Sequence, residues 1–240
     1  ITRADIANLI PGISNVNEST FTLTTTNPDL KPETSKNYNL SLEYYFEPVG
    51  QITVGWFKSE IKDLQRTLTN IPVTDSYLAD VYPGYTLSIT DNVASSETSG
   101  FEVDYAQQLA FLPGRLKGIG VFANYTRLHF DSWNNYLNSS KDTWNAGVSY
   151  SQGPFYAQFR ANYTGKRQTN TGVNGWYNFD GERLMCDVTA SFRINRRVTL
   201  FVNGKNIFDE PLWSYVGREE AWARYARFGG FWELGVKGTF

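Results

Sequence analysis

Arg227-Phe-Gly-Gly-Phe-Trp-Glu-Leu-Gly-Val-Lys-Gly-Thr-Phe240, the last stretch of the chain, carries two chemically different sets of residues at alternate positions. The apolar set, bracketed by aromatic rings, is Trp232, Leu234, Val236, Gly238 and Phe240. The intervening set holds charged, hydroxyl and glycine residues, together with Phe231. This period of two predicts a β-strand whose two faces meet different surroundings.

The chain ends on an aromatic residue, Phe240, with no polar tail after it. An aromatic last residue preceded by alternating apolar positions is typical of the terminal strand of an outer-membrane β-barrel. Such a strand would descend to the periplasmic rim, so its direction predicts the direction of every other strand.

The composition narrows the possible classes of protein. With 240 residues and a net charge of -2, the chain lacks the basic footprint of a nucleic-acid binder. No apolar run is long enough for a spanning helix. A mean hydropathy of -0.41 still allows a barrel, because barrel strands need apolar residues only at alternate positions. The single Cys186 forms no internal disulfide. The abrupt start and missing secretory segment lead us to expect a processed or truncated N-terminus.

Eight earlier segments show the same alternation, so we expect about nine strands in all. The eight are residues 38–46, 52–62, 101–109, 119–126, 143–150, 155–164, 184–194 and 198–203. Residues 1–36 are expected to be loop. The connections alternate between short turns (47–50, 112–115, 151–154 and 195–196) and long polar loops (64–97, 129–142, 166–182 and 207–226). Short periplasmic turns and long outer loops are what transmembrane barrels have.

Polar side chains in the middle of these strands favour a water-filled interior. Several strands are longer than the ~5–6 residues typical of soluble sheets. We therefore predict an all-β, antiparallel transmembrane β-barrel rather than a soluble sandwich or propeller. The residues expected to face the lumen are Glu102, Asp104, Arg160, Asp187 and Arg193.

Several motifs resemble those of TonB-dependent outer-membrane receptors. The segment Asn27-Pro-Asp-Leu-Lys-Pro-Glu-Thr34, followed by Asn37-Tyr-Asn-Leu-Ser-Leu-Glu-Tyr-Tyr-Phe46, is similar to the signature of their barrel domain. Gly100-Phe-Glu-Val-Asp-Tyr105, Ala123-Asn-Tyr-Thr126, Val202-Asn-Gly-Lys-Asn-Ile-Phe-Asp209 and the terminal Phe240 follow in the family's order. The resemblance covers nearly the whole chain.

The resemblance implies a partial barrel. Residues 1–240 would be the C-terminal portion of a roughly 22-stranded barrel, without the plug domain, the TonB-contacting segment and roughly the first thirteen strands. Phe240 would be the signal that the barrel-assembly machinery reads. The implied place is the cell outer membrane of a Gram-negative bacterium, in contact with outer-membrane lipid and lipopolysaccharide.

The implied activity is active import and not enzymatic catalysis. Family members import scarce or large nutrients, such as ferric siderophores, haem, cobalamin or oligosaccharides, with energy coupled through TonB. A passive outer-membrane porin is the main alternative, and a soluble binding sandwich is a second one. A plug domain upstream of residue 1 would exclude the porin, and partitioning into water without detergent would exclude both membrane proteins.

Aromatic residues in the expected outer loops are candidates for binding a small-molecule or oligosaccharide ligand. They can stack on sugar rings or flat chelators while nearby polar groups donate hydrogen bonds. The candidates are Trp133, Tyr136, Trp176, Tyr177, Trp213, Tyr215, Arg218 and Trp222. The aromatics would equally suit an outer girdle and loop packing. Arg218, Arg224 and Arg227 could meet an anionic siderophore or lipopolysaccharide phosphate, or pair with Glu219 and Glu220. The amide-rich surroundings favour a carbohydrate.

No catalytic, cofactor or metal site is expected. Glu102 and Asp104 share a strand face, but no nucleophile or base lies beside them in the pattern. His129 is the single histidine and has no cysteine or histidine cluster around it. Cys186 alternates with Leu184 and Val188, which predicts a small apolar residue on the lipid face.

Overall fold

A computed structural model describes residues 12–131, 139–169 and 176–238. The chain divides into two compact units, one formed by residues 1–38 and 59–97, and the other by 39–58 and 98–240. No helix in the described ranges is long and apolar enough to cross a membrane.

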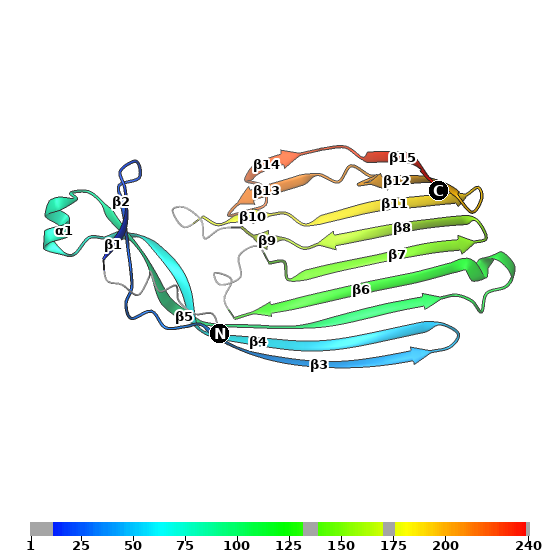
Figure 1. Ribbon diagram of the computed structural model, residues 1–240, viewed down its shortest axis with the longest axis horizontal. Helices are drawn as coiled ribbons and strands as arrows, with labels where there is room; N and C mark the ends of the chain where they lie inside the picture. The colour runs from blue at the N-terminus through cyan, green and yellow to red at the C-terminus, as the bar shows by residue number, and fades with distance from the viewer. Residues whose placement is uncertain (1–11, 132–138, 170–175, 239–240) are drawn as a thin grey trace. The chain divides into compact units, whose positions relative to one another are not determined.

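The second unit is built on one antiparallel sheet, whose strands follow each other in chain order (Figure 1). The strands of this sheet are β3 (Thr34–Phe46), β4 (Gly50–Pro72), β5 (Thr86–Gln108), β6 (Ile119–Phe130), β7 (Asp142–Gln152), β8 (Phe155–Thr164), β11 (Arg183–Arg193), β12 (Val198–Lys205) and β15 (Phe231–Gly238). Residues 34–38 of β3, 59–72 of β4 and 86–97 of β5 belong to the first unit. These nine correspond one to one with the predicted strands. β3 and β15 each pair on one side only, so the sheet is open within the described residues.

The short and the long connections lie at opposite ends of the strands, as predicted (Figure 1). One end of the strands carries 47–49, 109–118, 153–154 and 194–197, and the other carries the described parts of the long connections of the second unit, residues 139–141, 165–169, 176–182 and 206–230. The connection 109–118 is longer than the expected turn, because a short 3-10 helix at Gly114–Gly118 leads into β6.

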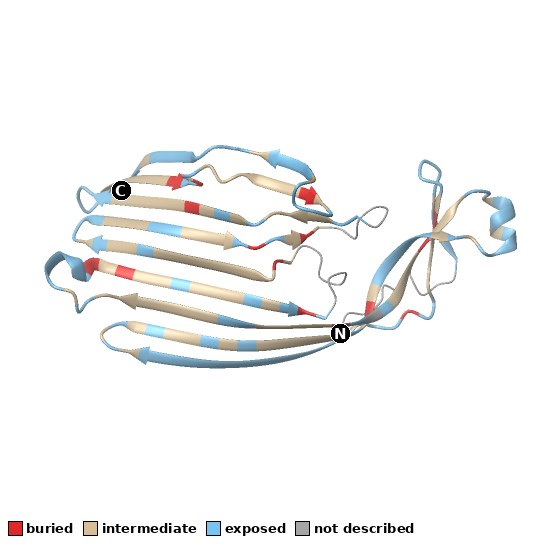
Figure 2. Cartoon of the chain, turned by 180° about the vertical axis from the view of Figure 1, so that it is seen from behind, coloured by how far each residue is buried: buried red, intermediate tan, exposed pale blue. Residues whose placement is uncertain are grey.

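Register assigns the predicted apolar and polar residues to separate faces. In β7 and β8 Val148 lies opposite Phe159, and β11 continues the row with Val188. In β12 and β15 Val202 lies opposite Leu234. Figure 2 shows these strands mainly intermediate or exposed, so no second layer covers either face. Leu234 is 81 % exposed, which suits a wall facing lipid rather than a folded core.

The first unit corrects two expectations. Residues 1–36 are not all loop, because β1 (Ile13–Asn17) and β2 (Thr22–Thr25) form a hairpin that joins β5 through a parallel pair. The expected loop 64–97 consists largely of the far ends of β4 and β5, joined around the short helix α1 (Ser76–Val81). Threonines and serines on both faces hide the alternation in these strand ends.

The Asn27–Thr34 motif is held to the first unit by side-chain hydrogen bonds to backbone. Asn92 accepts from the Lys31 amide at 2.7 Å and donates to the Lys31 and Asp63 carbonyls at 3.0 and 2.6 Å. Leu30 is buried, as are Leu23 and Leu64. The backbone polar groups of the motif thus form hydrogen bonds with side chains although the motif is not part of a sheet. These bonds fix the segment that leads into β3.

Candidate functional site

The polar face of the sheet is a band of hydrogen-bonded side chains running across the strands. Asn124 of β6 donates to Asp104 of β5, and Asn145 of β7 donates to Asn124 at 3.1 Å. Further along, Asn162 of β8 donates to Asp187 of β11 at 3.3 Å. Asp104, Asn124 and Asn145 lie directly opposite one another in the register, whereas Asn162 and Asp187 are diagonal neighbours on the same face. Two of the predicted lumen residues, Asp104 and Asp187, are thus partners in this band.

Arg160 lies directly opposite Asp187 on the same face. Its guanidinium lies 5.7 Å from the centroid of the Phe122 ring and donates to Gln158 at 3.3 Å. A hollow of about 300 Å³ beside it is lined by Gln158, Arg160, Asp187, Thr189, Asn203, Gly204 and Lys205. Glu102 lies opposite Thr126, and Arg193 lies opposite Thr199. The five predicted residues share a face but do not form one cluster.

A second, smaller sheet was missed by sequence reasoning. It consists of β9 (Arg167–Gln168), β10 (Asn178–Asp180), β13 (Leu212–Val216) and β14 (Trp222–Ala226), drawn from the two longest connections. In Figure 1 it lies at the long-connection edge of the nine-stranded sheet. Phe179-Asp180 and Leu212–Val216 have strand-forming sequences. The strands with which they pair lie far away in the chain, so no local pattern predicted this sheet.

One face of this small sheet is aromatic. Tyr215 is 3 % exposed and stacks on both Phe179 and Trp213, with centroids 5.1 and 5.5 Å apart. Trp222 and Tyr225 form another stacked pair at 5.3 Å. Burial raises the pKa of the Tyr215 phenol above its ordinary value. Three of the predicted ligand residues are therefore brought together on one face.

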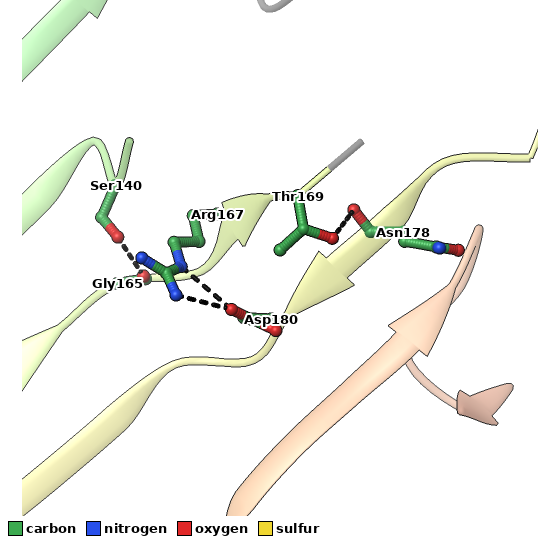
Figure 3. Close-up of polar contacts among 6 residues, drawn as sticks. All are labelled: Ser140, Gly165, Arg167, Thr169, Asn178 and Asp180. Carbon is green, nitrogen blue, oxygen red and sulfur yellow. Dashed lines mark hydrogen bonds and ion pairs between the residues drawn. The ribbon is translucent and has the colours of Figure 1, made fainter. Parts of the chain in front are cut away.

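The other face of the small sheet is polar (Figure 3). The Arg167 guanidinium donates to Asp180 at 2.9 Å and forms an ion pair with it at 2.8 Å. Thr169 donates to the Asn178 carbonyl at 3.3 Å, and Ser140 donates to the Gly165 carbonyl at 2.7 Å. These contacts join Ser140 to Gly165 and residues 167–169 to β10.

The remaining predicted ligand residues lie in the connections. Trp176 is 58 % exposed, and its ring fills the space beside Gly217. The Tyr177 carbonyl accepts a hydrogen bond from the Gly217 amide at 2.8 Å. Arg218 begins the turn between β13 and β14 and has no ion pair among the described residues. Trp133, Tyr136 and Phe240 lie outside the described residues.

The arginine and glutamate pairing considered from the sequence takes a different form. Arg227 lies 3.9 Å from Asp209, while Glu219 pairs with Lys166 at 3.3 Å. The Glu219 carboxylate, which accepts a hydrogen bond from the ammonium, raises the pKa of Lys166. The Lys166–Glu219 pair joins two connections, whereas the Arg227–Asp209 pair lies within the connection between β12 and β15.

The described ranges contain no group of three or more histidine, cysteine or acidic residues placed to hold a metal ion. Cys186 is buried in β11, opposite Ala161 on the apolar face. The arrangement suits a wall that separates lipid from a polar passage.

Comparisons with known proteins agree with this architecture. The family described as TonB dependent receptor-like, beta-barrel, matches residues 2–207. The vitamin B12 transporter BtuB of Vibrio vulnificus is 24 % identical over 205 residues, which are 82 % of this chain and 30 % of that protein.

Solved structures share the fold at low sequence identity. A mutant of the ferric enterobactin receptor PfeA from Pseudomonas aeruginosa has a TM-score of 0.65 and 16 % identity, covering 91 % of this chain and 33 % of that one. The siderophore receptor PirA from Acinetobacter baumannii gives 0.63 and 17 % over the same shares of the two chains, 91 % and 33 %. The chain thus spans about a third of the length of these relatives. With its nine-stranded wall and a family match over most of its length, the chain belongs to the TonB-dependent receptor family, in the β-barrel domain.

Proposed function

We propose that this chain forms the C-terminal part of the barrel wall of an outer-membrane importer. Its nutrient would be scarce or large, such as an oligosaccharide, a ferric siderophore, haem or cobalamin, with energy coupled through TonB. The observation that carries the proposal is the division of one sheet into an apolar face and a hydrogen-bonded polar face. That division suits a wall between lipid and a water-filled passage.

The relatives support active import over passive diffusion. One is named a vitamin B12 transporter and another a ferric enterobactin receptor. Both names describe uptake of bulky nutrients, for which a simple pore gives poor selectivity. A Gram-negative outer membrane, lipopolysaccharide and the barrel-assembly machinery complete the proposed setting.

Energy dependence is the deciding experiment. Cells carrying the full-length gene are given each labelled nutrient class, with and without a protonophore and with and without TonB. We expect import of one nutrient class, and this import should stop when the protonophore is added and in cells that lack TonB. Uptake that continues unchanged in cells lacking TonB would point to a passive porin.

For the nutrient contacts, we propose the connection residues Trp176, Tyr177 and Arg218, with Trp133 and Tyr136. The half-exposed ring of Trp176 offers a stacking surface, and Arg218 directly follows Gly217, beside which that ring lies. Trp176→Ala and Trp133→Ala are expected to weaken nutrient binding by about tenfold each, the scale of one lost aromatic contact. The matched control is Phe111→Ala, an exposed ring in the connection at the opposite edge of the sheet. Equal affinity in all variants would remove these aromatics from the binding site.

A further inference from the structure

The hollow beside Arg160, of about 300 Å³, places two cations around one carboxylate on the polar face. Arg160 of β8 lies directly opposite Asp187 of β11. The next residue of β11, Val188, lies opposite Gly204 of β12, so Lys205 takes the position beside Asp187 on its other side. We call the space bordered by Arg160, Asp187 and Lys205 the Arg160 hollow.

The single carboxylate does not neutralise the two cations. Asp187 already accepts a hydrogen bond at each of its oxygens, from the Asn206 amide at 2.9 Å and from the Asn162 side chain at 3.3 Å. Neither Arg160 nor Lys205 forms an ion pair within the part of the chain that the structure describes. The Arg160 hollow therefore keeps one net positive charge, together with most of the hydrogen-bond donors of its two cations.

The Arg160 guanidinium is held in position without losing its charge. It lies over the Phe122 ring, 5.7 Å from the centroid, and Gln158 accepts from one of its five donors at 3.3 Å. The planar fork that remains matches the two oxygens of a carboxylate, which a guanidinium binds through two parallel hydrogen bonds. Arg160 and Lys205 are both exposed, so a solute on the polar side of the wall can reach them.

The rest of the lining is polar and uncharged. Gln158, Thr189 and Asn203 contribute amide and hydroxyl groups to it. Asn203 donates to Glu233 at 3.1 Å, which leaves its side-chain oxygen as an acceptor. Such groups both donate to and accept from hydroxyls, whereas an apolar ligand would remove them from water without replacing their hydrogen bonds.

Positive charge continues along the polar face toward the short connections. Arg193 of β11 lies opposite Thr199 of β12, which in turn lies opposite Lys237 of β15. Glu233 lies between this row and the Arg160 hollow and is occupied by Asn203. The strands β8 to β15 thus present four cations on the polar face, at Arg160, Arg193, Lys205 and Lys237, and this part of the wall favours an anion.

These features together select the chemistry of the ligand. A carboxylate with one negative charge matches the single net positive charge of the hollow. A phosphate dianion gains less from it, because the cost of desolvating an ion grows with the square of its charge, whereas its attraction to the hollow grows only in proportion. A neutral sugar would satisfy the amides and the hydroxyl but leave the two cations unmatched.

We infer that the Arg160 hollow binds the carboxylate of a hydroxyl-bearing anion, such as a sugar acid or a hydroxy acid. Arg160 and Lys205 hold the carboxylate, while Gln158, Thr189 and Asn203 form hydrogen bonds with its hydroxyls. The inference rests on the proposed import function, in which the polar face lines the passage, and it narrows the nutrient to an anionic one.

The test uses the full-length protein in detergent and saturation-transfer nuclear magnetic resonance to measure dissociation constants. Three probes are titrated separately: glucuronate, its neutral methyl ester and inorganic phosphate. Wild type is expected to bind glucuronate about tenfold more tightly than either of the others, the scale of a hydrogen bond to a charged group. Arg160→Gln and Lys205→Gln are each expected to weaken glucuronate binding by about tenfold and to leave binding of the ester unchanged. Arg160→Lys, which keeps the charge but loses the planar fork, should fall between wild type and Arg160→Gln.

The control variant is Arg197→Gln, which removes the same charge from an exposed position in the turn 194–197, away from the hollow. It should bind all three probes like wild type. All variants should unfold at the wild-type temperature, since neither Arg160 nor Lys205 has an ion pair to lose. Equal binding of glucuronate and its ester overturns the inference, as does unchanged glucuronate binding in Arg160→Gln. An equal loss in Arg197→Gln, or phosphate binding as tight as that of glucuronate, also overturns it.

The carboxylate site and the importer fail by separate readouts. Import that stops in cells lacking TonB, by a protein that binds glucuronate and its ester equally, retains the importer and removes the site. Glucuronate binding that depends on Arg160, in a protein whose uptake continues without TonB, retains the site and removes the importer.

Discussion

Several glycines of the sheet lie beneath an aromatic ring of the neighbouring strand, where a larger side chain has no room. In β7 an added Cβ at Gly147 would lie 2.4 Å from the Phe122 ring and 2.5 Å from the Phe159 carbonyl oxygen. Phe122 sits directly opposite Gly147 in the register, and Phe201 and Trp232 cover Gly235 and Gly204 in the same way. An aromatic side chain that covers a cross-strand glycine restores packing that the glycine itself cannot supply.

Gly147→Ala is therefore expected to destabilise the protein by about 1–3 kcal/mol, the usual cost of overpacking. The Phe122 ring can shift, whereas the Phe159 backbone is fixed by the ladder. Gly55→Ala in β4 is the matched control, because its nearest neighbours lie 3.9 and 4.0 Å away. Thermal unfolding of the full-length protein in detergent, followed by gel mobility of heated samples, measures both. Equal unfolding temperatures for the two variants would contradict the packing argument.

Asn92 is the second residue with a specific expected effect. Asn92→Ala removes one acceptor and two donors at the Lys31 and Asp63 backbone, at a cost of roughly 1–3 kcal/mol. Faster hydrogen exchange and proteolysis are expected in residues 27–33, with β7 and β8 unchanged. The control is Asn37→Ala, because this exposed residue of β3 contacts only the Ser35 hydroxyl. Unaltered exchange in 27–33 would show that the contacts of Leu30 and Gln65 hold the motif without Asn92.

At the scale of elements, the small sheet depends on side chains because its strands are short. β9 and β10 share only two paired positions, Gln168 with Phe179 and Arg167 with Asp180. Asp180→Asn is expected to increase hydrogen exchange in both strands, since it removes the charge that holds Arg167. Lys166→Gln is the comparison, because its bridge is exposed and worth at most about 1 kcal/mol. Greater loss of protection in Lys166→Gln than in Asp180→Asn would reverse this ranking.

The bridge between Lys166 and Glu219 also predicts a pH response. The raised pKa of Lys166 means that the folded state holds the proton more tightly than the unfolded chain. Its small stabilisation is present below the ordinary lysine pKa and is lost as the pH rises through the raised value. Hydrogen exchange or fluorescence of the small sheet should thus be steady from neutral to mildly alkaline pH and loosen in strong alkali. Lys166→Gln should show a smaller alkaline step, because the buried Tyr215, whose pKa is also raised, still ionises in strong alkali.

Sequence reasoning found the elements whose pattern is local. Alternation identified all nine strands of the main sheet, including the faces of Phe159, Val188 and Leu234. It missed the outer part of β4 and β5, where threonine and serine occupy both faces, and the hairpin of β1 and β2. It also missed the pairing of Phe179 with Tyr215, because partners so distant in the chain leave no period to read. The loop aromatics were proposed as ligand contacts, but the small sheet that carries Trp213, Tyr215 and Trp222 was not foreseen.

For the whole molecule, the terminal aromatic gives the clearest prediction. Deletion of Phe240 from the full-length protein is expected to lower its level in the outer membrane several-fold, since the resemblance makes this residue an assembly signal. Replacement by Tyr should preserve the level. Quantitative blotting of outer-membrane fractions measures both. Full levels after the deletion would remove Phe240 from the assembly role.

The open edges of the nine-stranded sheet have a consequence for any preparation of residues 1–240 by themselves. β3 and β15 each expose one row of backbone donors and acceptors to the surroundings. The two edges belong to different strands, so copies that join β15 of one molecule to β3 of the next make a head-to-tail contact. Nothing in such a contact limits the number of copies. Growth into long, polydisperse ribbons is therefore the natural fate of this segment, unless other strands of the same polypeptide occupy both edges first.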